Sequence, residues 1–143
     1  MNRHDDDQDP IAGESLPRIK PGDYDAVCYK VGSGRGYGGR KDIYIQFRIT
    51  EGEHEGVELF MACTNYGKKI KPRCKYYIQW TIAKGRSPEK GERLSRNIFL
   101  NRLYRIRVRD TMRKYKDGTS LPDCVQYSVV ESILAVLVGD APE

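Results

Sequence analysis

The segment that decides the fold is IYIQFRITEGEHEGVELFMACT, residues 43–64. Apolar side chains take every second position in its first half, at Ile43, Ile45, Phe47 and Ile49, and again in its second half, at Val57, Leu59, Met61 and Cys63. This period of two is typical of strands that bury one face. The polar turn EGEHEG, residues 51–56, separates the halves. Matching the two apolar faces predicts an antiparallel hairpin with Ile49 opposite Val57 and Phe47 opposite Leu59.

The other face of this hairpin is predicted to point outward. The same register places Arg48 opposite Glu58 and Gln46 opposite Phe60, so the outer face carries Tyr44, Arg48 and Phe60. A large aromatic side chain on an outer face needs a partner, either protein or ligand. The hairpin therefore supplies a first candidate binding surface.

The segment before the hairpin, VGSGRGYGGRKDIY at residues 31–44, combines features that suit single-stranded nucleic acid. Its five glycines let the backbone approach a ligand closely. Its basic side chains supply charge for phosphates, and its tyrosines supply flat faces on which bases stack. The candidate binding residues here are Arg35, Tyr37, Arg40 and Lys41. A solvated hairpin loop whose charges only aid solubility is the alternative interpretation.

Three further strands are expected, at residues 23–31, 98–110 and 123–131, and the apolar run 133–138 either extends the last or packs beside it. In the second of these, an apolar face formed by Tyr104, Ile106 and Val108 alternates with a cationic stripe formed by Arg105, Arg107 and Arg109. The stripe is a candidate nucleic-acid contact. Its alternative interpretation is the solvated face of an edge strand, which charge protects from aggregation.

A second basic loop, Met112–Ser120, follows the cationic stripe. Asp117-Gly118 is its turn signal. The loop contributes four candidate binding residues: Arg113, Lys114, Tyr115 and Lys116.

The periodicity changes at residue 70 and predicts a short amphipathic helix over residues 71–84. Pro72 suits its first turn, and Gly85 suits its end. The inner positions are expected to be Cys74, Ile78 and Ile82, whereas Lys75, Gln79 and Lys84 are expected to face solvent. Trp80 is interpreted as a core residue.

Composition indicates one domain and a polyanionic partner. The 143 residues include 25 basic and 20 acidic side chains, with a sequence pI of about 9.0. Residues 1–20 are predicted to be a disordered acidic arm that carries Asp5, Asp6, Asp7 and Asp9. The domain is expected over residues 21–138, followed by a polar tail, residues 139–143. With no long apolar run and no signal or transit peptide, a soluble cytoplasmic protein is expected.

Enzyme, metal and cofactor chemistry are not expected. The four cysteines form no Cys-x-x-Cys pair, both histidines lie far from them in sequence, and reduced, packed thiols are the better interpretation. The glycines of residues 32–39 fit neither a phosphate loop nor a dinucleotide fingerprint, since no Gly-Lys-Ser/Thr follows and a strand comes next.

The order of elements is strand, long loop, strand, short turn, strand, helix, strand, long loop, strand. Together with the opening PGDYDAVCYKV (residues 21–31), the hairpin of residues 43–64 and the segment NIFLNRLYRIRVRD (residues 97–110), it resembles the OB-fold single-stranded DNA-binding proteins of phages, plasmids and other mobile elements. The resemblance lies in layout and strand texture over residues 21 to about 138. It implies a mainly β, five-stranded barrel with one helix between the third and fourth strands.

The resemblance also implies a groove across the second and third strands, walled by the loops Gly32–Lys41 and Met112–Ser120. The expected function is sequence-tolerant binding of single-stranded DNA in replication or recombination. A protein-interaction module, such as a replication accessory or inhibitor, and an RNA-binding OB-fold are the alternatives. Because the chain ends in GDAPE without an aromatic residue, a replication or recombination protein that it recruits is expected to bind the acidic arm rather than a C-terminal tip.

Overall fold

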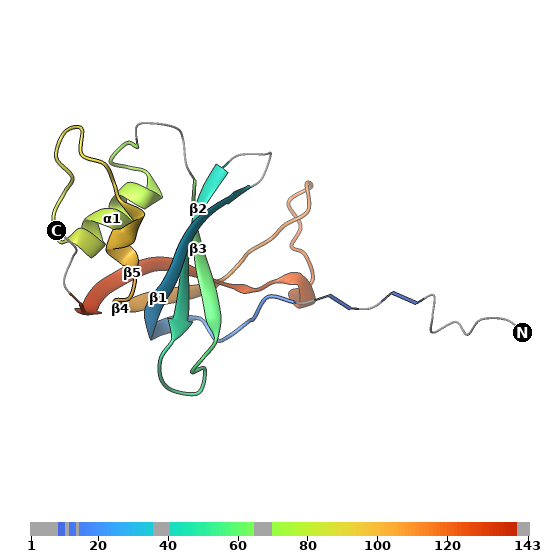
Figure 1. Ribbon diagram of the computed structural model, residues 1–143. Helices are drawn as coiled ribbons and strands as arrows, with labels where there is room; N and C mark the ends of the chain where they lie inside the picture. The colour runs from blue at the N-terminus through green and yellow to red at the C-terminus, as the bar shows by residue number, and fades with distance from the viewer. Residues whose placement is uncertain (1–8, 11, 14, 36–40, 65–69, 140–143) are drawn as a thin grey trace, which may run out of the picture.

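The computed structural model describes residues 9–10, 12–13, 15–35, 41–64 and 70–139. Five antiparallel strands form one sheet in the order β3-β2-β1-β4-β5. Their bounds are β1 Gly22–Arg35, β2 Lys41–Ile49, β3 Glu58–Thr64, β4 Leu103–Asp110 and β5 Ser128–Val138. Helix α1, Lys75–Lys84, lies between β3 and β4 in the chain (Figure 1). The expected mainly β fold with five strands and a helix after the third is confirmed.

The hairpin of β2 and β3 has the predicted register. Phe47 pairs with Leu59, Arg48 with Glu58, and Gln46 with Phe60. Its predicted inner residues are buried, except that Val57 is half-buried in the turn before β3. Alternation was sufficient to predict this hairpin because a slip of one residue would expose every one of these apolar side chains.

The sheet is bent rather than flat. Strand β1 is long enough to pair with β4 in one half of the sheet and with β2 in the other. Its first part, residues 22–27, pairs with β4, and its later part, residues 26–35, pairs with β2. Tyr29 is the extra residue of a bulge in the ladder with β2, just after the pairing with β4 ends. Bulges increase bend and twist. In Figure 1, β4 and β5 accordingly run across the direction of β1, β2 and β3.

Strand β5 contains three more bulges. Glu131, Leu134 and Leu137 are skipped in its ladder with β4. The amide side chain of Gln79 on α1 supports one of these irregular sites, because it accepts a hydrogen bond from the Ile133 N–H at 2.8 Å and donates to the Ser132 hydroxyl at 3.1 Å. The bulges account for the curved path of β5 in Figure 1.

The sheet does not close into a barrel in the described part of the chain. Its edge strands, β3 and β5, contact one another, but no backbone ladder joins them among the described residues. The structure therefore supports the coarse prediction of a five-stranded antiparallel sheet.

Two predicted strands begin later than expected. Residues Arg96–Phe99 form a 3-10 helix whose start is capped by the Ser95 hydroxyl, so β4 begins at Leu103 instead of residue 98. Another 3-10 helix, Asp123–Val125, follows Pro122, so β5 begins at Ser128 instead of residue 123. The run 133–138 extends β5, which was one of the two expected outcomes.

Helix α1 differs from its prediction in start and in face. It begins at Lys75, because Cys74 has extended backbone angles after a turn closed by the bond from Cys74 N–H to the Lys71 carbonyl. The left-handed Gly85 ends it as expected. Its buried residues are Tyr76, Gln79, Trp80 and Ala83. The assignment of Gln79 to solvent and Ile78 to the core is therefore wrong, and Ile78 is 44% exposed.

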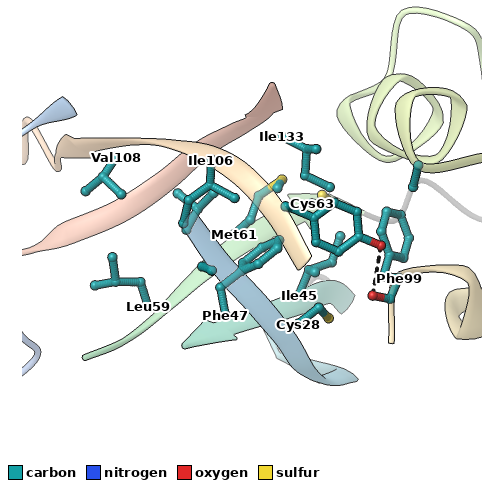
Figure 2. Packing of buried hydrophobic residues seen from close by; sticks show 14 of the residues in the cluster. Cys28, Ile45, Phe47, Leu59, Met61, Cys63, Phe99, Ile106, Val108 and Ile133 are labelled. Atoms are coloured by element: carbon teal, nitrogen blue, oxygen red, sulfur yellow. Dashed lines mark hydrogen bonds between the residues drawn. The ribbon is translucent and has the colours of Figure 1, made fainter. Parts of the chain in front are cut away.

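The inner face of the sheet and the buried face of α1 enclose one hydrophobic core (Figure 2). Phe47 meets Tyr104 edge to face, with centroids 5.9 Å apart. The Tyr104 hydroxyl donates to the Phe99 carbonyl oxygen at 2.9 Å, as drawn in Figure 2. Trp80 is 2% exposed, so its assignment to the core is confirmed.

Packed structure begins before residue 21. Ile19 is buried, and its backbone N–H and carbonyl both bond to the Ser128 hydroxyl, at 2.7 and 3.2 Å. The Ser128 N–H donates to the Pro17 carbonyl, and the Arg18 guanidinium pairs with Asp110 at 3.1 Å. Residues 17–20, which the sequence assigned to the arm, thus form a strap across the start of β5 and the end of β4.

Candidate nucleic-acid interface

Three aromatic side chains gather on the outer face of β2 and β3. The ring centroids of Tyr44 and Phe60 are 5.7 Å apart, and those of Phe60 and Tyr127 are 6.2 Å apart. All three side chains are half-buried. We call them the aromatic trio. The outward positions of Tyr44 and Phe60 were predicted, whereas Tyr127 was missed because it joins them through a contact with Phe60 between distant segments of the chain.

Gly34 on β1 leaves room for the Tyr44 ring. A Cβ atom at Gly34 would lie 2.9 Å from the Cε2 atom of Tyr44, closer than such contacts allow. Glycine at this position thus permits the Tyr44 ring to lie against the β1 backbone. The glycine-rich segment has a structural role here, and its first residues belong to β1 rather than to a loop.

A polar network lies beside the aromatic trio. Arg48 donates to the Glu58 carboxylate at 2.8 Å, and its guanidinium carbon lies 4.6 Å from the centroid of the Tyr29 ring. The Tyr29 hydroxyl donates to the Gln46 side-chain oxygen at 2.8 Å. The hydrogen bond from Arg48 lowers the pKa of Glu58, and burial is the main cause that raises the pKa of Tyr29. Sequence register predicted the Arg48–Glu58 pair but not the contribution of Tyr29.

The loop Met112–Ser120 forms a small hairpin, which we call the basic hairpin. Lys114 pairs with Ser120, and the Tyr115 N–H donates to the Thr119 carbonyl at 2.8 Å. Asp117 accepts hydrogen bonds from the backbone N–H and the hydroxyl of Thr119. The exposed Gly118 has a positive φ, so the turn predicted at Asp117-Gly118 is present. Its candidate residues are all exposed: Arg113, Lys114, Tyr115 and Lys116.

Gln126 anchors the basic hairpin. Its side-chain oxygen accepts from the Arg113 N–H and the Thr111 hydroxyl, both at 3.0 Å. Its side-chain nitrogen donates to the Arg113 carbonyl at 3.1 Å and to the Leu121 carbonyl at 3.3 Å. The adjacent Tyr127 exchanges hydrogen bonds with Thr111. The base of the basic hairpin therefore lies beside the aromatic trio, because Thr111, which directly precedes the hairpin, bonds to the backbone of Tyr127.

The cationic stripe of β4 is exposed as predicted, but acidic residues of β1 compensate two of its charges. Arg105 pairs with Asp25 at 3.0 Å, and Arg107 pairs with Asp23 at 3.2 Å. Arg109 donates to the Asp110 carbonyl. Strand β4 lies between β1 and β5, so the edge-strand interpretation of the stripe is wrong.

The remaining candidates lie at or beyond the limits of the described structure. Tyr37 and Arg40 lie outside the described residues. Arg35 ends β1 opposite Lys41, which is exposed at the start of β2. The structure thus brings together Tyr44, Arg48 and Phe60 with the base of the basic hairpin, and it places the β4 stripe on the other half of the bent sheet.

No group of His, Cys, Asp and Glu residues within the described ranges is arranged to hold a metal ion. The cysteines are unpaired: Cys28, Cys63, Cys74 and Cys124. Helices in the described part of the chain are too short or too polar to cross a membrane. Comparison of the chain with protein-family models and with curated proteins gives no match in either case.

Proposed function

We propose that this chain is an OB-fold protein that binds single-stranded DNA without strong sequence preference, in replication or recombination. The observation that carries the proposal is the aromatic trio, Tyr44, Phe60 and Tyr127, on the outer face of β2 and β3 at the base of the basic hairpin. The strand order with α1 between β3 and β4 supports the OB-fold assignment.

The proposed mechanism divides the work between two kinds of side chain. Bases stack on the half-buried rings of the aromatic trio, where each stacked base contributes roughly 1 to 3 kcal/mol. Lysine and arginine side chains of the basic hairpin contact phosphates and release counterions. Stacking accepts any base because every base has a flat face, so the interaction tolerates sequence.

Single strands are favoured over duplex because the rings need unstacked bases. Fluorescence anisotropy with a labelled dT oligomer, a duplex of equal length and a matched RNA, each at several salt concentrations, tests this. If about four to six phosphates are contacted, log K against log salt has a slope of roughly −3 to −4 for the single strand. Equal or tighter binding to duplex would contradict the proposal, and tighter binding to RNA would favour the RNA-binding alternative.

Charge variants identify the phosphate contacts. Lys114→Gln and Lys116→Gln in the basic hairpin are expected to reduce the salt slope by about 0.7 each. Lys90→Gln is the matched control, because Lys90 is also exposed but lies in the connection after α1.

A protein-interaction module remains the second candidate, favoured by the exposed apolar side chains of β5: Leu134, Leu137 and Val138. Binding centred on such side chains weakens little with salt, whereas phosphate contacts weaken steeply. A protein partner retained at high salt, together with no binding to any nucleic acid, would select this candidate.

A further inference from the structure

The inference concerns a pair of opposite charges beside the aromatic trio. Arg48 on β2 and Glu58 on β3 are direct cross-strand partners, with Nη2 and Oε2 2.8 Å apart. Their side chains are 49% and 48% exposed. The Arg48 guanidinium also lies over the Tyr29 ring, so it is held in place on both sides.

The pair lies in line with the aromatic side chains. Glu58 and Phe60 are two residues apart on the same face of β3, and Gln46, the partner of Phe60, is two residues from Arg48 on β2. Successive side chains on one face of a strand are neighbours. A nucleic-acid strand stacked on Phe60 therefore passes close to the Arg48 guanidinium.

Carboxylate and phosphate oxygens make the same kind of charge-assisted hydrogen bond to a guanidinium. We propose that Glu58 occupies, in the unbound protein, the position on Arg48 that a phosphate of the bound strand takes, and so acts as a built-in competitor that weakens binding. This inference rests on the proposed function. It adds to that function one residue, Glu58, which limits the affinity of the chain for nucleic acid.

The contact is suited to being exchanged. In the described structure, Arg48 donates a single hydrogen bond to the Glu58 carboxylate. By contrast, Arg86 donates two to the Glu92 carboxylate, at 2.8 and 2.9 Å. Exposed pairs with a single contact are weak and are screened by salt. The ring of Tyr29 keeps the guanidinium in place when the carboxylate leaves.

The test measures the affinity of the full chain for a labelled dT oligomer at low salt. Glu58→Gln is expected to tighten binding by about two- to five-fold, since a surface ion pair contributes that much. In an Arg48→Ala background, the same substitution is expected to change affinity by less than about 1.5-fold, because the competed group is gone. The gain of Glu58→Gln is expected to shrink at high salt.

Asp23→Asn is the matched control. It removes one negative charge from a pair of similar exposure, 44% for Asp23 and 52% for Arg107, on the β1–β4 half of the sheet. Melting curves establish that each variant is folded. Equal tightening by Asp23→Asn, no tightening by Glu58→Gln, or a gain that persists without Arg48 would each overturn the competitor role while the wild-type chain still binds. Failure of the wild-type chain to bind the oligomer would instead remove the proposed function, and the competitor role with it.

Discussion

The carbonyl oxygen of Gly139 accepts hydrogen bonds from both Nε and Nη2 of Arg102, at 3.2 and 3.1 Å. The other end of the same guanidinium donates to the carbonyls of Ala83 and Ile98, at 2.8 and 3.0 Å. Arg102 is 6% exposed, and its bonds to Ala83 and Ile98 are buried, whereas those to Gly139 are partly buried. One buried cation thereby ties together the end of α1, the 3-10 helix before β4 and the residue that follows β5.

Arg102→Ala is expected to lower the free energy of unfolding by about 2 to 4 kcal/mol, because it removes the buried hydrogen bonds to the Ala83 and Ile98 carbonyls and the partly buried ones to Gly139. Thermal or urea unfolding measures the change. Gly139→Ala is a second probe of the same contact, since its Cβ would lie 2.9 Å from the Arg102 Cγ and its φ is +112°. Wild-type stability in Arg102→Ala would show that the guanidinium contributes nothing to folding.

Tyr44→Ala and Phe60→Ala are each expected to weaken binding to single-stranded DNA by roughly 1 to 3 kcal/mol while the domain stays folded. The reason is that both rings are half-buried on the outer face of the sheet. Phe47→Ala is the inward control. Phe47 has no exposed surface, and its truncation is expected to destabilise the fold by roughly 3 to 5 kcal/mol. Anisotropy and melting together check the assignment, and collapse of Phe60→Ala would contradict it.

Two deletions at the N-terminus are expected to differ in their effect on stability. Deleting residues 1–15 leaves the strap of residues 17–20 in place, so the melting temperature should not change. If the acidic arm competes with DNA, the same deletion tightens DNA binding a few-fold, and only at low salt. Deleting residues 1–20 removes buried Ile19 and its bonds to Ser128, which should cost about 2 to 4 kcal/mol of stability. Equal melting of the two truncated chains would contradict a stabilising strap. Unchanged low-salt affinity after the shorter deletion would leave partner recruitment as the use of the arm.

Alkaline pH is expected to destabilise the fold. Burial raises the pKa of the Cys28 thiol to about 12 and that of Cys63 to about 11, and it also raises the pKa of Tyr76 and Tyr104. Groups with a raised folded pKa contribute stability that is complete below their unfolded pKa, here 9.0 for the thiols, and is lost as pH rises toward the folded value. Urea unfolding between pH 8 and 11 measures this loss, which should start near pH 9.

The same burial predicts the order of thiol labelling. Cys124 is exposed and is expected to react first with an alkylating reagent, whereas Cys28 and Cys63 should react only when the protein unfolds. Mass spectrometry of the labelled native protein checks the order. Early labelling of Cys28 would show that the core between β1 and β4 opens locally.

The face of α1 illustrates where sequence reasoning failed. Steps of four residues indicated Cys74, Ile78 and Ile82 as inner positions, yet Tyr76 and Trp80 also stand four apart and face the core. Tyr76 packs against Phe99, and Gln79 is buried because its amide bonds to the bulged part of β5. The sequence carried both patterns, and only the neighbouring elements selected between them.

Local periodicity by itself determined the β2–β3 hairpin, the register that sets Arg48 opposite Glu58, and the outward positions of Tyr44, Phe60 and the β4 arginines. These features follow from the alternation of side chains along a strand, which acts between near neighbours. Only the tertiary structure decided that Tyr127 joins the aromatic trio, that Gln126 anchors the basic hairpin, and that Asp25 compensates Arg105 from 80 residues away. Such contacts depend on bulges and on the pairing of distant strands, and a period of two residues carries no information about either.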